Sequence, residues 1–131
     1  MREILFRGKR TDNEKWVCGD FRNTNTMYPH DAFIALENGI HLPVKPETVG
    51  QYTGMKDKND NRIFEGDIIK LEEEVKNIFN VSDGEVKYGW GGFYIGKFST
   101  LNSLNTLASY NSILRGEVVG NIHDNPELLT P

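Results

Sequence analysis

The chain has 131 residues, of which 37% are hydrophobic and 26% are charged, and its formal net charge is −4. This composition is typical of a folded globular protein and excludes an intrinsically disordered chain. The acidic balance, with a pI near 5.4, argues against wholesale binding to phosphate backbones, although a local basic patch is compatible with it. The length suits one domain over residues 1–131, or two intertwined small β sub-barrels.

The sequence also predicts the cellular compartment of the protein and whether it contacts a membrane. Cys18 is the only cysteine, so no intrachain disulfide can form, and no cationic leader followed by an apolar segment stands at the start. Both features favour the reducing cytoplasm. No apolar run approaches the ~20 residues that span a bilayer, so we expect no contact with a membrane.

The first half of the chain reads as short strands joined by polar turns. Alternating apolar residues on either side of the turn TDNE predict a hairpin over residues 2–21. Residues 22–48 contain several turn-forming residues, and we expect an irregular excursion with one strand at most. Residues 63–71 (IFEGDIIKL) predict a strand, and the pair Gly66-Asp67 predicts a bulge or tight bend within or beside it.

The second half gives one clear hairpin and two ambiguous segments. Alternation over residues 84–98 predicts two strands, with Gly91-Gly92 supplying the positive φ of a tight turn. Residues 72–80 fit a helical turn or an extended connection, and residues 101–114 fit helix and strand equally. Residues 116–122 predict a last strand, followed by a polar stop that can hold one helical turn. We expect a mainly β fold, small and barrel-like, of short antiparallel strands with at most one or two short helices.

The polar segment that starts at Asp57 begins like a calcium-binding loop. Asp57, Asn59 and Asn61 occupy its first, third and fifth positions. Such a loop needs glycine at the sixth position and a bidentate carboxylate at the twelfth, where this chain has Arg62 and Ile68. The histidines are too far apart in sequence to suggest a zinc site. We therefore expect no metal site.

Turn chemistry explains the same segment better than catalysis does. We expect Asn59 and Asp60 to form a two-residue hairpin turn with both φ angles positive, and Asp67 to hydrogen-bond backbone N–H groups. Nothing predicts two carboxylates with divergent pKa values, so no catalytic residue is expected. Cys18 is expected to be a small buried apolar residue. The predicted turn and bulge residues are Asn59, Asp60, Gly66, Asp67, Gly91 and Gly92.

Aromatic residues near lysines suggest a candidate interaction surface for single-stranded nucleic acid. Aromatic residues in small β domains are more often part of the core, and the chain has 15 basic against 19 acidic residues. We therefore expect any affinity for nucleic acid to be weak. The candidate surface consists of Tyr52, Lys56, Lys58, Phe64 and Trp90.

Three blocks of the sequence resemble the YopX family of phage and prophage proteins. They are MREILFRGKR, VGQYTGMKDKNDNRIFEGDIIK and GEVVGNIHDNPELL, which match the family patterns REIxFRxK, QYTGLKDKNGKxIYEGDIV and EVIGNIYENPELL in the same order. The family commonly has glycine at the position of Asp60 and leucine at that of Met55. Residues 22–46 and 72–115 are not diagnostic.

The resemblance implies an all-β, barrel-like fold, a phage or prophage origin in a bacterial host cell, and self-association into a homo-oligomer. It implies no activity and no cofactor, because the family has none that can be assigned to residues of this chain. We expect a non-enzymatic accessory protein that acts by binding a phage or host protein. Two alternatives stay open: a nucleic-acid-binding β-barrel, and an enzyme whose site forms only in an oligomer.

Overall fold

The computed structural model describes residues 4–23, 32–79, 82–89, 92–96 and 116–129. The chain divides into two compact units, Met1–Gly54 and Met55–Pro131. Each unit has its own cluster of buried apolar side chains. The expectation of a single domain over residues 1–131 stays a prediction.

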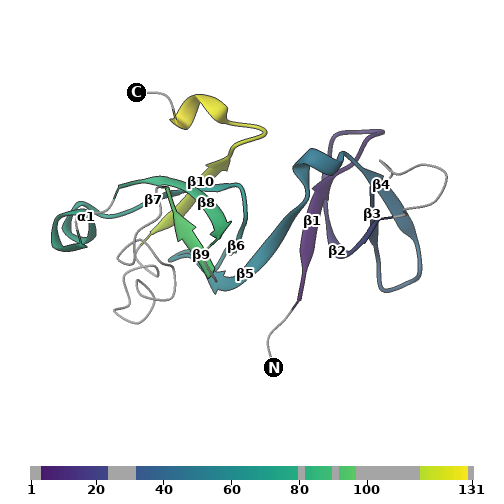
Figure 1. Ribbon diagram of the computed structural model, residues 1–131, viewed down its shortest axis with the longest axis horizontal. Helices are drawn as coiled ribbons and strands as arrows, with labels where there is room; N and C mark the ends of the chain where they lie inside the picture. Colours follow the sequence, from purple (N-terminus) through teal and green to yellow (C-terminus); the bar gives the residue numbers. More distant parts are fainter. Residues whose placement is uncertain (1–3, 24–31, 80–81, 90–91, 97–115, 130–131) are drawn as a thin grey trace. The chain divides into compact units, whose positions relative to one another are not determined.

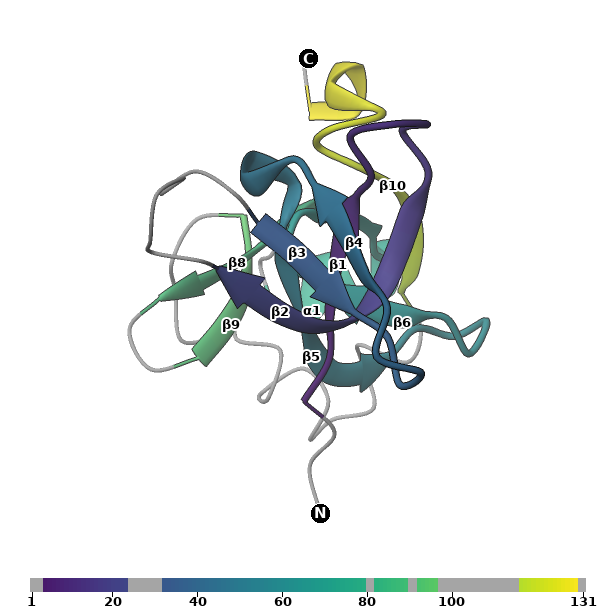
Figure 2. The ribbon, with the colours of Figure 1, turned by 90° about the vertical axis from the view of Figure 1, so that its right-hand side faces the viewer.

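The first unit is an antiparallel sheet of short strands (Figures 1 and 2). Its elements are β1 (Phe6–Lys9), β2 (Trp16–Asn23), β3 (Ala32–Ala35), β4 (His41–Val44), the 3-10 turn η1 (Pro46–Thr48) and the start of β5 (Gly50–Lys56). Hydrogen-bonded neighbours follow the order β4-β3-β2-β1-β5. The hairpin predicted for residues 2–21 is confirmed by the pairing of β1 with β2.

The structure corrects the expectation for residues 22–48. In the described part of this segment, β3 and β4 form a second hairpin. The Asn38 side chain accepts a hydrogen bond from the N–H of Ile40 at 3.1 Å, and Gly39 takes a φ of 88°, which glycine tolerates without steric cost. Pro43 is compatible with a strand because β4 lies at the edge of the sheet.

One face of this sheet carries the core of the first unit. Alternation along β2 and β3 puts every second side chain on that face. Ile34 is 0% exposed and Val44 is 2% exposed. The buried residues are Ala32, Ile34 and Val44, and Phe6, Val17, Phe21, Leu36 and Val49 pack against them.

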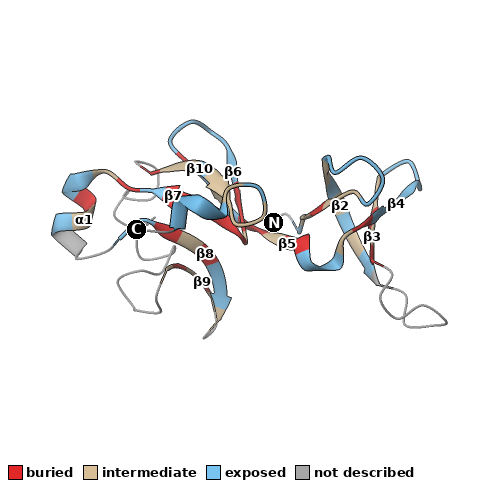
Figure 3. Cartoon of the chain, turned by 90° about the horizontal axis from the view of Figure 1, so that it is seen from above, coloured by how far each residue is buried: buried red, intermediate tan, exposed pale blue. Residues whose placement is uncertain are grey.

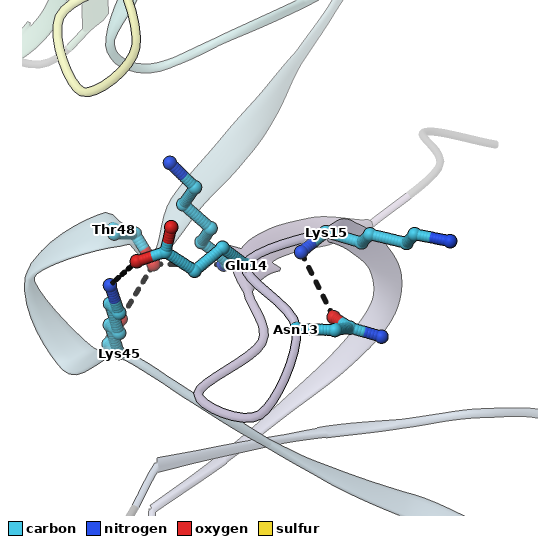
Figure 4. A network of polar contacts seen from close by, with 6 residues as sticks. Asn13, Glu14, Lys15, Lys45 and Thr48 are labelled. Atoms are coloured by element: carbon cyan, nitrogen blue, oxygen red, sulfur yellow. Dashed lines mark hydrogen bonds and ion pairs between the residues drawn. The ribbon is translucent and has the colours of Figure 1, made fainter.

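Polar contacts near η1 tie the end of β4 to the end of β1 (Figure 4). The N–H of Lys45 donates to the carbonyl oxygen of Lys9 at 2.8 Å, and the N–H of Lys9 donates to Oγ1 of Thr48 at 2.9 Å. The Lys45 ammonium also lies 2.6 Å from the carboxylate of Glu14. The sheet thus folds back on itself, although within the described residues it does not close into a barrel.

The second unit contains a four-stranded antiparallel sheet in the order β10-β7-β8-β9. Its elements are β6 (Arg62–Phe64), β7 (Asp67–Lys70), α1 (Glu73–Phe79), β8 (Gly84–Gly89), β9 (Gly92–Ile95), β10 (Glu117–Asn121) and the 3-10 turn η4 (Pro126–Leu129). β6 pairs with β5, which enters the unit from the first one. Among the described residues, no helix has the length and apolar character needed to cross a membrane.

Apolar side chains from β6 to β9 and from α1 form the core of the second unit, and Figure 3 marks the buried positions along β7 and β8. Val75 of α1 is 1% exposed, so the short helix is held by its contact with this core. The members are Ile63, Ile69, Leu71, Val75, Val86, Phe93 and Ile95.

Several predictions for this half of the chain can be compared directly. The bend predicted at Gly66 exists, with a φ of 89°, and it separates β6 from β7. The ambiguous residues 72–80 contain helix α1, and the hairpin over residues 84–98 is confirmed by the pairing of β8 with β9. The last strand and the final helical turn are confirmed as β10 and η4. Residues 101–114 lie outside the described residues. The fold is mainly β, as predicted.

Candidate functional site

Asp57, in the most polar stretch of the sequence, is buried and engaged by backbone groups. The residue is only 3% exposed. The carboxylate accepts hydrogen bonds from the N–H groups of Asn61 (2.8 Å), Asn59 (2.9 Å) and Val118 (2.9 Å). Burial alone would raise the pKa of Asp57, but the hydrogen bonds from these three N–H groups outweigh it and hold the pKa below its ordinary value.

The turn after Asp57 differs from the expected one. The N–H of Asp60 donates to the carbonyl oxygen of Asp57 at 3.0 Å, and the N–H of Asp57 donates to the carbonyl oxygen of Asn61 at 2.9 Å. Asp60 has a φ of 67°, whereas Asn59 does not have a positive φ. The loop is therefore a three-residue hairpin in which a turn is followed by one left-handed residue. The expectation of two positive φ angles was wrong for Asn59.

Asp67 also accepts a hydrogen bond from the backbone. It is 1% exposed, and its carboxylate accepts a hydrogen bond from the N–H of Phe64 at 2.7 Å across the bend at Gly66. Both carboxylates stabilise turns of the backbone.

The candidate interaction surface from the sequence is not assembled as an exposed aromatic platform. Tyr52 and Phe64 are each 5% exposed, so their rings offer no open stacking face. Lys56 and Lys58 are exposed, and the Lys56 ammonium lies 3.6 Å from the carboxylate of Asp60. Trp90 lies outside the described residues.

The predicted turn glycines, the buried cysteine and the absence of a metal site can also be compared with the structure. Gly92 is the first residue of β9 and does not have a positive φ, and Gly91 lies outside the described residues. Cys18 is exposed, so the expectation that it is buried was wrong. Within the described ranges no three His, Cys, Asp or Glu side chains lie close enough to hold a metal ion.

The first unit carries a different surface, here named the outer face, on the side of its sheet opposite the core. Residues paired across strands point to the same side, so the register of β1 to β4 defines this face. All of its side chains are exposed or half-exposed. Its members are Arg7, Lys9, Trp16, Cys18, Asp20, Arg22, Phe33, Ala35, His41 and Pro43.

Aromatic rings lie at both ends of the outer face. The guanidinium carbon of Arg7 lies 4.7 Å from the ring centroid of Trp16, within the range of a cation–π interaction. The rings of Phe33 and His41 lie 6.5 Å apart and are tilted by 44°. Arg22 is the cross-strand partner of Phe33.

A hollow of about 620 Å³ borders the outer face and has Cys18, Asp20 and Ala35 of that face in its lining. The other lining residues are Ile4, Leu5, Gly19, Leu36, Glu37 and Asn38. Arg22 reaches the rim carboxylate of Asp20 at 3.7 Å. Polar and apolar groups contribute about equally to this lining, and small binding sites combine the two.

Sequence reasoning missed the outer face, although part of its signal was present. Trp16, Cys18, Asp20 and Arg22 stand two residues apart, which places them on one side of a strand. The other half of the face comes from β3 and β4, in a segment expected to be irregular. The face could be assembled only once that hairpin was known.

A family model described as YopX protein matches residues 5–130, nearly the whole chain. The fold resembles that in the crystal structure of protein EF1440 from Enterococcus faecalis, with a TM-score of 0.56 and 22% sequence identity. The similarity covers 99% of this chain and 100% of that one. At this identity the likeness concerns the fold alone. No curated protein matches the chain.

Proposed function

Because the chain belongs to the YopX family, as its three sequence blocks indicated, we propose that it is a non-catalytic binding protein of phage or prophage origin that self-associates in the bacterial cytoplasm. The observation that carries the binding role is the outer face. It carries aromatic, cationic and apolar side chains and borders a hollow of about 620 Å³. Exposed aromatic and arginine side chains are the groups enriched at binding interfaces.

The carboxylates favour binding over catalysis. Asp57 and Asp67, the buried acidic residues of the polar segment, accept hydrogen bonds from backbone N–H groups of their own turns. A catalytic acid or base needs a proton exchanged with a substrate, and these groups are engaged in holding the fold. Turn stabilisation therefore accounts for the polar residues that first suggested a site.

Affinity capture tests the binding role. The tagged chain would be used to capture partners from lysate of phage-infected host cells, with and without nuclease. Arg22→Glu on the outer face should abolish capture, whereas Arg62→Glu, an exposed arginine of β6, should leave it intact. Equal capture by the wild type and Arg22→Glu would contradict a binding role for the outer face.

Self-association is supported by the short open sheets, whose edges and second faces are difficult for a small β domain to cover alone. Symmetric closure, as a dimer or a ring, would be expected. Static light scattering at micromolar concentrations should give a mass that is a multiple of 14.9 kDa. The mass of one chain at every concentration would exclude this part of the proposal.

A further inference from the structure

We propose that the outer face binds a short single strand of nucleic acid, with a base held in the hollow that Cys18, Asp20 and Ala35 help to line. The inference rests on the proposed binding function and names its ligand. Two features support it, the exposed aromatic rings of the outer face and the chemistry of the hollow, while the small number of cations sets the expected salt dependence.

Stacking supplies the first contact. Trp16 and Phe33 are half-exposed on the outer face. The guanidinium carbon of Arg7 lies 4.7 Å from the ring centroid of Trp16, and Arg22 is the cross-strand partner of Phe33. Bases stack on aromatic rings and on guanidinium planes whatever their sequence. Arg22, the partner of Phe33, stands six residues after Trp16, so the two stacking positions are about 20 Å apart along β2.

The hollow suits a base that carries an amino group. Asp20 and Glu37, which carry carboxylates, and Asn38, which carries an amide, are among its lining residues. A carboxylate accepts a hydrogen bond from the amino group of cytosine, and that of adenine offers the same donor. Thymine and uracil carry the O4 carbonyl where cytosine has its amino group, so an acceptor would face these carboxylates at that position and only the ring N3–H could donate. Ala35 and Leu5 provide an apolar surface for the plane of the base.

Charge limits the phosphate contribution. The outer face holds three cations, Arg7, Lys9 and Arg22, against the carboxylate of Asp20. Two or three phosphate contacts to a single strand give a salt slope of about −1.4 to −2.1. The net charge of −4 fits this picture, because stacking rather than counterion release would supply most of the affinity.

A titration with labelled strands of about ten nucleotides, a length within the site sizes of small β domains, tests the assignment. Oligo-dC and oligo-dA should bind the full chain with micromolar dissociation constants at physiological salt, and oligo-dT several-fold more weakly. Ribonucleotide strands run in parallel would show whether RNA or DNA is preferred. Equal or tighter binding of oligo-dT would overturn the role of the hollow.

Paired variants locate the site. Phe33→Leu should weaken binding about 5-fold or more, the effect of losing one stacked base, and Arg22→Ser should also weaken it. Tyr88→Leu, which removes an aromatic residue 59% exposed in the second unit, and Arg62→Ser should change affinity less than 2-fold, roughly the resolution of additive distant effects. Loss of binding in the controls but not in the outer-face variants would overturn the proposal.

The single cysteine reports occupancy of the hollow in the wild-type protein. Cys18 is exposed and lines the hollow, so bound oligo-dC should slow its reaction with a maleimide reagent. Binding without any protection of Cys18 would place the ligand elsewhere and overturn the proposal. If no strand binds while a protein is captured through Arg22 regardless of nuclease, this inference fails and the proposed binding function stands.

Discussion

The carboxylate of Asp57 accepts a hydrogen bond from the backbone N–H of Val118, which lies 61 positions further along the chain, at 2.9 Å. The same turn makes a second contact with this region, because the N–H of Lys58 donates to the carbonyl oxygen of Gly116 at 3.0 Å. The hairpin turn between β5 and β6 is therefore fastened to the start of β10. One buried side chain connects the turn with the last strand of the second unit.

Removal of the Asp57 carboxylate should destabilise the fold strongly. Asp57→Ala removes the acceptor of three part-buried hydrogen bonds from backbone N–H groups, which should lower the free energy of unfolding by about 3 kcal/mol. Urea denaturation followed by circular dichroism measures this change. Asp60→Asn is the control, because Asp60 is exposed and should alter stability by less than about 0.5 kcal/mol. Equal effects of the two substitutions would refute the role of Asp57.

Acid should weaken the same contact. The folded protein holds the pKa of Asp57 below its ordinary value of 3.8, so this carboxylate binds fewer protons when folded than when unfolded. Its contribution to stability is complete above pH 3.8 and is lost as the pH falls through the lowered folded pKa. Thermal midpoints between pH 7 and pH 2 should fall less in Asp57→Asn than in the wild type. Parallel curves for both proteins would contradict this prediction.

Local patterns made part of this architecture predictable. The β1–β2 and β8–β9 hairpins were visible because alternation and turn residues lie within a few positions of one another. The β3–β4 hairpin was not, since Pro43 is tolerated only at a sheet edge, and edge position depends on the order of the strands. The contact of Asp57 with Val118 was hidden for a similar reason: sequence separation conceals which strand lies beside a turn.

Glycine at position 60 should stabilise the hairpin turn. Asp60 has a φ of 67°, a left-handed conformation that is strained for residues with a Cβ and free for glycine. We expect Asp60→Gly to raise the free energy of unfolding by about 0.5–1 kcal/mol, less a few tenths for the exposed pair with Lys56. Chemical denaturation measures this change in the free energy of unfolding. Asn59→Gly should not stabilise, because Asn59 is outside the left-handed region; a gain there alone would show that the turn is misassigned.

Glycine at position 19 should be required for a different reason, the close approach of β2 and β3. A Cβ at Gly19 would lie 2.4 Å from the carbonyl oxygen of Ala35, a backbone atom that cannot move without shifting β3. A Cβ at Gly8 would lie 2.9 Å from Cβ and Cγ2 of Val44, a less severe overlap than that at Gly19. A Cβ at Gly92 would meet nothing within 4 Å. These three positions form a graded series.

The expected order of stability therefore follows the space available. Gly19→Ala should lower the free energy of unfolding by about 2–3 kcal/mol, the upper part of the range for an overpacked site. Gly8→Ala should cost less, and Gly92→Ala should be neutral or stabilise by up to about 1 kcal/mol, because alanine restricts the unfolded chain. Denaturation midpoints of the three variants in one buffer give the order. If Gly19→Ala were as stable as Gly92→Ala, β2 and β3 could not approach each other at Gly19 as closely as the structure has them.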